Sequence, residues 1–446
     1  GTLAGHPRGC PGPAWNGCSD SLTSRAASRA AISCGIPVSS WCSAGPCARR
    51  DRRAFARVDA WRIAVRSVDS VTSGTIPKKE RAGPPRRILY ALGPGDVVHA
   101  YREWRAGREF TAETSITYSS QFFDYCRQTG TEAFAVSSHP RKEVVRDGRF
   151  VVENRPKRFA NAGGALYHLS QLHYAASILW TALRHRPGAV IVDSGTTHWF
   201  LLAPLRIAGI PVIASMHNVL WAPGFPPSQT ARRLLLWLAG WFWRHVAQAT
   251  LCVSPECERQ VHTIAGKPRG RVFQHRAQFR PSLFESVAPR PPHGLRPFRV
   301  LFVGRVEENK GVFDLVAMAN RLNASFPGQF EWHVCGHGSA SPELARQVHA
   351  RGLDEVVFLL GKLDQGPLRD EYGWAHLLVV PTRSDIGEGF SMVAAEAVLA
   401  GRPVVSSRVT PAIDVLGDAF VAAQPDDVES YVAAIRRLAE DRTEYA

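Results

Sequence analysis

The chain has 446 residues, 45% of them hydrophobic, and this length predicts two or three domains with ample material for large cores. It carries 54 Lys and Arg against 39 Asp and Glu, a net charge of +15 that suits nucleic acid, a membrane surface or an anionic substrate. No apolar run reaches the roughly 18 residues that a membrane-spanning helix needs, so we expect no such helix.

The first 85 residues differ in composition from the rest of the chain. They hold 13 Lys and Arg, 5 Asp and Glu and five of the nine cysteines, and they are rich in Ser, Ala, Gly and Pro. This composition predicts disorder. Because the first methionine is Met216, we expect residues 1–85 to lie upstream of the native start. The alternative is an organelle-targeting peptide, since Arg25 and Arg29 stand among serines with few acids nearby.

From residue 86 onward, short apolar runs alternate with longer helical ones. Continuous apolar runs are typical of strands buried on both faces, and the intervening helices predict parallel pairing through crossovers. Ser254 followed by Pro255 is typical of a helix start. The expected strands of this half are Arg87–Gly93, Ala133–Ser137, Ala189–Asp193, Pro211–Met216, Thr250–Ser254 and Arg271–Gln274.

A proline-rich run at residues 288–297 is the best candidate for a linker, between a first domain of residues 86–287 and a second of residues 298–446. Ser341 with Pro342 repeats the helix-start pattern in the second half. We therefore predict an α/β protein with two doubly wound Rossmann-like domains that face a cleft, where ligands bind at the carboxyl ends of the strands. The second set of expected strands is Phe298–Val303, Glu331–Cys335, Val356–Leu360, Leu377–Pro381, Pro403–Ser406 and Ala419–Ala422.

Residues 234–243 form a run rich in Leu and Trp, with Arg233 before it and Arg244 after it. One interpretation is a buried helix of the domain, and the other is a helix that lies in a membrane interface with Trp at headgroup level. The four cysteines beyond residue 85 have no metal-ligand spacing and indicate a reducing compartment. We therefore expect a cytoplasmic protein, which under the second interpretation contacts the inner membrane face peripherally.

Two strand ends of the first domain carry candidate residues. Gly93 and Gly95 suit a turn that touches a phosphate or an acceptor, but Val98 stands where a dinucleotide fingerprint needs its third glycine. His217 would face the cleft and hydrogen-bond a sugar hydroxyl or a developing charge, although a lone histidine is more often structural. Asp193 ends another strand and has the same two interpretations.

In the second domain, Arg305 and Lys310 straddle the turn between the first strand and the next helix. Both would reach an anion at that helix N-terminus, Arg as a planar fork and Lys as a mobile point charge. The alternative is a solvated basic turn that pairs with the two glutamates between them. Gly336 and Gly338 follow the next strand and would let a backbone approach a nucleotide closely.

Glu388 and Glu396 are the most informative pair in the chain. If both lie on a helix, eight residues span about 12 Å with a rotation of about 80°, so both carboxylates address one extended ligand. That separation exceeds the roughly 5–10 Å of glycosidase carboxylates, so we do not expect paired acid/base hydrolysis. The alternative is a surface helix with two solvated acids, although the flanking residues are small or apolar.

Together these motifs resemble the retaining glycosyltransferases of family 4, which have the GT-B fold. The first domain matches more loosely, through His217-Asn218 and Val253-Ser254. The motifs that carry the resemblance, in the family's order, are Phe302-Val303-Gly304-Arg305 with Lys310-Gly311, Gly336-His337-Gly338, Val356 to Gly361, Glu388-Gly389-Phe390 through Glu396-Ala397, and Gly401-Arg402-Pro403-Val404-Val405.

The resemblance implies a hexosyltransferase that uses a nucleotide sugar, retains the anomeric configuration and needs no metal and no cofactor. Arg305 and Lys310 would hold the donor pyrophosphate, and Glu396 the ribose hydroxyls. Glu388 would contact the transferred sugar, and His217 would lie near its reacting face. A saccharide or a lipid-linked sugar is the expected acceptor. Backbone amides that would assist at the sugar and phosphate belong to Gly389, Phe390 and Ser391.

The chain departs from the family pattern in three places. The segment 274–278 replaces an expected Asn-Gly element, and the turn at 93–96 replaces the usual double glycine. The sequence stops at Ala446, where the family continues with a helix that crosses back onto the first domain, so we expect a truncated C-terminus. Two rival functions remain open. One is a GT-B nucleotide-sugar epimerase, and the other a basic nucleic-acid-binding protein, which is disfavoured because about half of the charge excess lies in residues 1–85.

Overall fold

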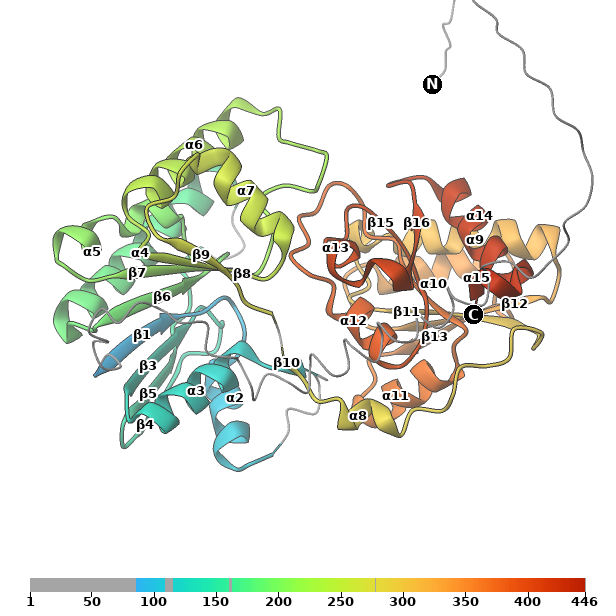
Figure 1. The fold of residues 1–446 in the computed structure, drawn as a ribbon, viewed down its shortest axis with the longest axis horizontal. Coiled ribbons are helices and arrows are strands. Elements are labelled where there is room, and N and C mark those ends of the chain that lie inside the picture. The colour runs from blue at the N-terminus through green and yellow to red at the C-terminus, as the bar shows by residue number, and fades with distance from the viewer. Residues whose placement is uncertain (1–85, 109–114, 160–162, 277, 446) are drawn as a thin grey trace, which may run out of the picture. The chain divides into compact units, whose positions relative to one another are not determined.

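The computed structural model describes residues 86–108, 115–159, 163–276 and 278–445, all of which belong to one compact unit within residues 50–446. The expectations for residues 1–85 therefore lie outside the described residues. Two sheets organise this unit, one built from strands before residue 275 and the other from strands after residue 297 (Figure 1).

The first sheet has eight strands in the order β4-β5-β3-β1-β6-β7-β8-β9, and every neighbouring pair is parallel except β4 with β5. Its order reverses between β1 and β6, as in a doubly wound sheet. All six strands predicted for this half are confirmed, with ends that shift by at most two residues, whereas the hairpin β4–β5 was not predicted. The strands are β1 Arg87–Ala91, β3 Glu132–Ser137, β4 Glu143–Asp147, β5 Phe150–Asn154, β6 Ala189–Asp193, β7 Val212–Met216, β8 Ala249–Cys252 and β9 Arg271–Gln274.

Helices cover both faces of this sheet. On one face lie α2 Val97–Arg105 and α3 Tyr118–Thr129. Ser254 caps α7 as predicted, because its hydroxyl accepts from the amide of Cys257 at 3.3 Å. The opposite face carries α4 Gly164–His185, η2 Trp199–Leu202, α5 Pro204–Ile207, α6 Thr230–His245 and α7 Pro255–Ala265.

The second sheet has six parallel strands in the order β13-β12-β11-β14-β15-β16, and its order reverses between β11 and β14. The six predicted strands are confirmed, with ends that shift by one residue at most. They are β11 Phe298–Val303, β12 Phe330–Cys335, β13 Val357–Gly361, β14 Leu377–Val380, β15 Val404–Ser407 and β16 Phe420–Ala423. The helices around them are α8 Ser282–Glu285, η3 Glu308–Lys310, α9 Val312–Ser325, α10 Ser341–Ala350, α11 Gln365–Trp374, α12 Met392–Leu399, α13 Ile413–Leu416, η4 Gly417–Ala419, α14 Val428–Glu440 and α15 Arg442–Tyr445. A separate two-stranded sheet pairs β2 Ser115–Ile116 with β10 Gln278–Phe279.

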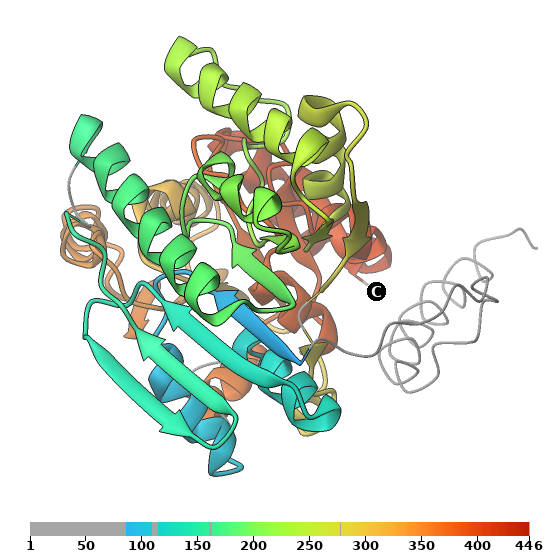
Figure 2. The ribbon, with the colours of Figure 1, turned by 90° about the vertical axis from the view of Figure 1, so that its left-hand side faces the viewer.

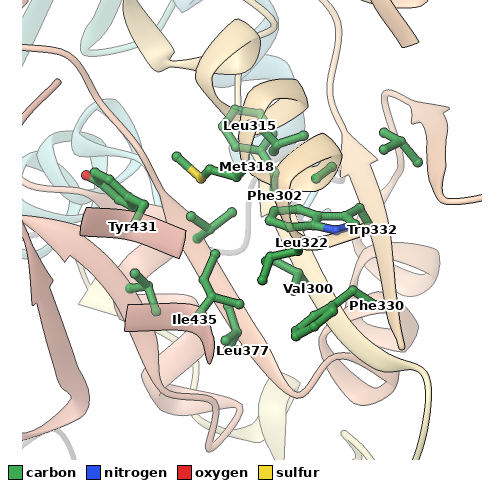
Figure 3. Packing of buried hydrophobic residues seen from close by; sticks show 14 of the residues in the cluster. Val300, Phe302, Leu315, Met318, Leu322, Phe330, Trp332, Leu377, Tyr431 and Ile435 are labelled. Atoms are coloured by element: carbon green, nitrogen blue, oxygen red, sulfur yellow. The ribbon is translucent and has the colours of Figure 1, made fainter. Parts of the chain in front are cut away.

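The core of the second sheet holds its strands and helices in fixed positions around the loops at the strand ends. Trp332 from β12 and Phe302 from β11 pack against Leu315 and Leu322 of α9, and Ile435 of α14 closes the same layer (Figure 3). Burying one such side chain contributes about 1.5–3 kcal/mol. The strand ends that carry the polar candidates therefore project from a rigid base.

Two local expectations are wrong. Ser341 does not cap α10 but is its first residue, and its hydroxyl accepts from the amide of Gly338 at 3.1 Å. Glu388 lies in the loop before α12, which begins at Met392, so it does not share a helix with Glu396. The helical spacing of about 12 Å therefore does not describe this pair.

Candidate active site

Polar groups gather where the second sheet reverses its order. β11 is followed by Gly304 and Arg305, and β14, which pairs with β11, is followed by Pro381 and Thr382. Ligands of open α/β sheets bind at such a switch point, outside the carboxyl ends of the strands. Arg305 is exposed there, so its guanidinium group is accessible to a ligand. Lys310 was predicted to lie at this point as well, and Thr382 was not.

Glu388 is joined to this switch point by two side-chain contacts. The Nζ atom of Lys310 lies 2.9 Å from Oε1 of Glu388, and the hydroxyl of Thr382 donates to Oε2 at 2.9 Å. The side chains of Lys310 and Glu388 are 17% and 13% exposed, so their charges are partly desolvated. An anion that enters here competes with Glu388 for the ammonium group.

The N-terminus of α12 follows Glu388 in the chain. Ser391 precedes the helix and is 1% exposed, and within the described ranges its hydroxyl has no hydrogen-bond partner. No described side chain caps this helix. Buried hydroxyls are ordinarily hydrogen-bonded, and uncapped helix N-termini attract anions. A phosphate oxygen at this position would satisfy both the hydroxyl and the helix amides.

Glu396 lies inside α12 and is buried. Tyr372 donates its hydroxyl to Oε2 of Glu396 at 2.7 Å. Burial first, and the Glu396 charge second, raises the pKa of Tyr372 well above its ordinary value, so the phenol stays protonated. This bond fixes the orientation of the carboxylate, and a carboxylate has lone pairs for several donors at once.

Close packing between loops accounts for Gly336 and Gly338. A Cβ atom on Gly336 would lie 1.7 Å from the carbonyl oxygen of Gly304, and one on Gly338 would lie 2.2 Å from that of Val306. Both positions therefore need glycine for the loop after β12 to rest on the loop after β11. This packing explains the glycines without a ligand, and their approach to a nucleotide stays a prediction.

On the first sheet, His217 follows β7 and is held by three neighbouring strands. Its Nε2 atom lies 2.9 Å from Oδ1 of Asp193 and 2.9 Å from the hydroxyl of Ser215, and Tyr90 donates to Oδ2 of Asp193 at 3.1 Å. Burial, followed by the Asp193 charge, raises the pKa of Tyr90 well above its ordinary value. Because a carboxylate only accepts, the Nε2–H of His217 donates to Asp193, and in the neutral form of the ring Nδ1 is the acceptor.

Two aromatic neighbours of His217 were missed in the sequence analysis. The ring of Tyr118 packs edge-on against His217 with centroids 4.3 Å apart, and it lies 5.3 Å from the ring of His275. Burial, followed by the nearby His217, lowers the pKa of His275. His275 belongs to the segment that departs from the family pattern, which was the available signal. Tyr118 starts a helix, and no local pattern connects it to a strand end.

The loops that carry His217 and Glu388 touch each other. A Cβ atom on Gly389 would lie 1.9 Å from the carbonyl oxygen of His217, and one on Gly387 would lie 2.7 Å from that of Val219. Glycine is therefore required at both positions. Phe390 packs against the buried cores of both sheets. The structure thus brings together His217 and the segment 387–391, as the resemblance implied.

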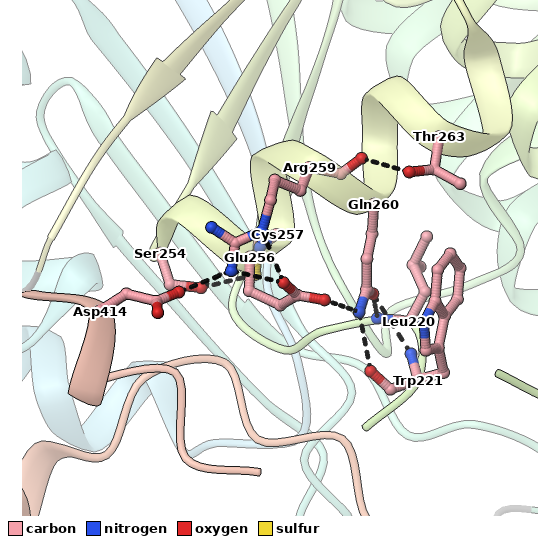
Figure 4. Close-up of polar contacts among 9 residues, drawn as sticks. All are labelled: Leu220, Trp221, Ser254, Glu256, Cys257, Arg259, Gln260, Thr263 and Asp414. Atoms are coloured by element: carbon pink, nitrogen blue, oxygen red, sulfur yellow. Dashed lines mark hydrogen bonds and ion pairs between the residues drawn. The ribbon is translucent and has the colours of Figure 1, made fainter. Parts of the chain in front are cut away.

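Helix α7 supports the loop after β7 from behind. The side chain of Gln260 accepts from the amide of Leu220 at 2.7 Å and donates to the carbonyl of Trp221 at 2.9 Å (Figure 4). The adjacent Arg259 reaches Asp414, which belongs to α13, at 2.6 Å. That ion pair is solvent-exposed and contributes little, whereas Gln260 is buried and its bonds fix the loop.

The predicted turn at Gly93 and Gly95 is less constrained. A Cβ atom on either residue would meet nothing within 4 Å, so alanine fits at both positions. Asp96 caps α2 by accepting from the amide of His99 at 2.9 Å, which explains the turn locally. Contact of these glycines with a phosphate or an acceptor stays a prediction.

Other kinds of site are less well supported. In the part of the chain that the structure describes, no group of three or more His, Cys, Asp or Glu is arranged to hold a metal ion. Nor does any helix among the same residues combine the length and apolarity needed to cross a membrane. The cysteines of this part are buried and unpaired, namely Cys126, Cys252, Cys257 and Cys335.

Two family models match the chain. The model described as glycosyl transferases group 1 matches residues 297–441, and the glycosyl transferase 4-like domain matches residues 116–276. A glycogen synthase of Mycobacterium tuberculosis is 32% identical over 157 residues, which are 35% of this chain and 36% of that protein. D-inositol 3-phosphate glycosyltransferase 2 of Catenulispora acidiphila is 32% identical over 295 residues, an alignment that covers 59% of this chain and 66% of that protein. The chain thus spans 36% and 66% of the lengths of these two relatives.

Solved structures share the architecture at lower identity. An alpha,alpha-trehalose-phosphate synthase (UDP-forming) from Burkholderia vietnamiensis superposes with a TM-score of 0.60 and 16% identity, over 80% of this chain and 92% of that one. This likeness concerns the fold alone. With two doubly wound sheets, and with both family models matched in order, the chain belongs to the family 4 glycosyltransferases, the glycosyl transferases group 1, and has the GT-B fold.

Proposed function

We propose that the chain transfers a sugar from a nucleoside-diphosphate sugar to a saccharide or lipid-linked acceptor, with retention of configuration and without a metal. The observation that carries this proposal is the uncapped N-terminus of α12 with the unpartnered hydroxyl of Ser391. In the chain this helix N-terminus stands between two carboxylates, Glu388 at the switch point and Glu396 inside the helix. An extended ligand with a phosphate at its centre suits this order of groups.

In this proposal the donor lies along the start of α12. Lys310 and Arg305 hold the pyrophosphate, and the amides of Gly389, Phe390 and Ser391 add hydrogen bonds to it and to the sugar. Glu396 takes the ribose hydroxyls, oriented by its bond from Tyr372. Glu388 contacts the transferred sugar. When the donor binds, the carboxylate loses its contact with Lys310 and accepts hydrogen bonds from the sugar hydroxyls instead.

In the transfer step, the bond between the sugar's anomeric carbon and the phosphate oxygen breaks, and the acceptor hydroxyl bonds to that carbon. The hydroxyl proton passes to the leaving phosphate oxygen. Negative charge grows on that phosphate, where Lys310, Arg305 and the helix N-terminus stabilise it. His217, whose Nε2 is held by Asp193, presents Nδ1 as an acceptor near the sugar's reacting face.

The compartment and the donor follow from weaker observations. The buried, unpaired cysteines of the described residues support a reducing compartment, and we place the reaction in the cytoplasm. The trehalose-phosphate synthase that shares the fold is named as UDP-forming, which makes uridine diphosphate the first nucleotide to try. Donor sugar and acceptor are separate questions for a screen.

The experiment is a thermal-stabilisation screen of nucleoside diphosphates and nucleotide sugars, followed by calorimetric titration of the best ligand. We expect saturable binding by the parent and weak binding by the Lys310→Ala and Glu396→Ala variants. Parent-like binding by both variants refutes the site. Product analysis without an acceptor separates transfer from epimerisation, because an epimerase needs none. RNA binding at varied salt by a chain that lacks residues 1–85 tests the nucleic-acid alternative.

A further inference from the structure

The helices on one face of the first sheet expose an unusual number of large apolar side chains. Trp180 on α4 is 69% exposed, Trp237 on α6 is 65% exposed, and Ile207 at the end of α5 is 90% exposed. Single exposed apolar residues are common, but a group of them marks an interaction surface. Together with the following residues we call them the α4–α6 face: Leu166, Tyr167, Leu169, Leu172 and Leu183 on α4, and Leu234 and Trp241 on α6.

These side chains belong to one layer. Tyr174 of α4, Leu202 of η2 and Phe242 of α6 are buried in the same core over the first sheet, and η2 contacts both α4 and α6. Figure 2 shows α4 and α6 on the outside of the sheet, with η2 and α5 between them. Since the opposite sides of these helices are buried in this core, their exposed sides face outward on the same side of the sheet.

The charge of the segment that holds these helices is mostly positive, and among the described residues only Arg155 at its start is paired with an acid, Glu153, just outside it. Residues 154–255, which include all of these helices, contain nine Lys and Arg but only one acidic residue, Asp193. Asp193 is buried beside His217 and does not contribute to the surface. Arginines lie at both ends of α6, at Arg232, Arg233 and Arg244. The α4–α6 face therefore combines exposed apolar side chains with arginines at the ends of α6 and at Arg206 of α5.

We propose that the α4–α6 face docks the protein on an anionic membrane surface. Trp and Leu side chains would enter the boundary between headgroups and acyl chains, where Trp is favoured, and the arginines would reach up to lipid phosphates. Charge complementarity selects this partner. A second copy would bring two strongly basic surfaces together, and residues 1–85 carry 13 Lys and Arg against 5 acids, so they too would be repelled.

This inference deepens the proposed function, because a membrane-docked enzyme meets a lipid-linked acceptor at the surface. Its link to a lipid-linked acceptor rests on the proposed function, whereas docking on vesicles is measured without any transfer reaction. The buried-helix interpretation of residues 234–243 holds for the inner side of α6, and the interfacial interpretation stays a prediction for its outer side. Ala239, Gly240, Phe242 and Trp243 are buried in the core, while Leu234, Trp237 and Trp241 face outward.

The experiment is flotation of the full chain with vesicles of phosphatidylcholine alone or mixed with phosphatidylglycerol, at low and high salt. We expect binding to the mixed vesicles only, weakened by salt. The double variant Trp180→Ser/Trp237→Ser should lower the bound fraction on the order of tenfold, whereas Tyr125→Ser/Phe358→Ser, which changes exposed aromatic residues elsewhere, should not.

A charge pair completes the design. Arg232→Gln/Arg233→Gln should weaken binding to anionic vesicles on the order of tenfold at low salt, and Arg351→Gln/Lys362→Gln, exposed residues of the second sheet's domain, should leave it unchanged. Equal binding to both vesicle types, or no difference between face and control variants, overturns the proposal. The proposal is also overturned if the parent does not bind vesicles but sediments as a dimer and only the Trp variant sediments as a monomer. That result would assign the face to a second copy of the chain.

The donor site provides the independent check. Lys310→Ala should bind vesicles like the parent, and the Trp180→Ser/Trp237→Ser variant should bind nucleoside diphosphate like the parent in solution. Loss of nucleotide binding with intact flotation would therefore count against the proposed function alone. Intact nucleotide binding without flotation would count against the docking surface alone.

Discussion

Replacing Lys310 by methionine tests the donor site, because the ammonium group is expected to leave one anionic partner, Glu388, for another, the pyrophosphate, when the donor binds. In the free protein the ammonium lies 2.9 Å from Glu388. In the complex we place it on the pyrophosphate. Lys310→Met keeps all but the last atom of the side chain's length and removes the charge. Glu388→Gln keeps the shape of the carboxylate and removes the competing anion.

The magnitudes follow from burial and contact geometry. A charge-assisted contact to a phosphate is worth about 1.5–3 kcal/mol, so Lys310→Met should weaken nucleoside diphosphate binding by about 10- to 150-fold. Lys310 and Glu388 are 17% and 13% exposed, which puts their pair between surface and buried cases. Without the ion pair to Glu388, Lys310 should bind the phosphate more strongly, and the binding free energy should become more favourable by about 0.3–1 kcal/mol. Glu388→Gln should therefore tighten nucleoside diphosphate binding about 2- to 5-fold.

The assay is calorimetric titration with the nucleoside diphosphate alone, so that the loss of sugar contacts does not enter. Thermal unfolding checks that both variants are folded; Lys310→Met should lose about 1–3 kcal/mol because Glu388 then lacks its counter-charge. The reasoning is refuted if Lys310→Met binds within twofold of the parent. It is also refuted if Glu388→Gln weakens binding as much as Lys310→Met does.

Three further predictions concern the rest of the site and the fold. Glu396→Ala should weaken nucleoside diphosphate binding by at least tenfold, while Tyr372→Phe, which removes only the orienting bond, should cost less than Glu396→Ala in the same titration. Asp193→Asn should lower the transfer rate with an unchanged donor KM, because it releases the ring of His217; a parent-like rate across pH 6–9 would contradict this role. Burial lowers the pKa of His376 to about 4, and its Nδ1 accepts from the amide of Arg299 at 3.0 Å. The folded state therefore resists protonation of His376, and the free energy of unfolding should fall as the pH drops from 6.5 to 4. The expected loss is a couple of kcal/mol, about half of what the full pKa shift would give. In thermal unfolding measured against pH, His376→Phe should flatten this slope.

Most of the predicted strands were predictable because they are buried on two faces and read as apolar runs, as β1 and β14 do. The hairpin β4–β5 was missed because it lies at a sheet edge, where Val144 is exposed and Val152 is buried. Such half-buried strands alternate and give no continuous run. Asp147-Gly148 between the two runs was the signal for a hairpin, and it was overlooked.

The site was predictable in its parts but not in its connections. Glu388, Glu396 and Lys310 were found from motif spacing, yet the Lys310–Glu388 contact joins residues 78 positions apart. No local pattern encodes it. The helix start was placed too early although Gly389, a poor helix former, and Ser391, a typical N-cap residue, both indicated a later start. In the structure, contact of Gly389 with the loop of His217 holds this segment in a non-helical form.

The glycines illustrate the same difference between sequence and packing. Gly336 and Gly338 suggested space for a nucleotide, whereas the structure places the carbonyls of Gly304 and Val306 in the space above them. The arrangement of Asp193, Tyr90 and Tyr118 around His217 depends on three strands and a helix that meet only after folding. Tertiary contacts decide these features, and a single sequence does not contain them in readable form.

The central claim is that the N-terminus of α12 binds the donor phosphate between Glu388 and Glu396. A crystal structure of the complex with the best-binding nucleoside diphosphate tests it most directly. We expect a phosphate oxygen within hydrogen-bond distance of the Ser391 hydroxyl, Lys310 moved from Glu388 to the phosphate, and the ribose on Glu396. A nucleotide bound elsewhere, with Ser391 still unpartnered and Lys310 still on Glu388, would contradict it.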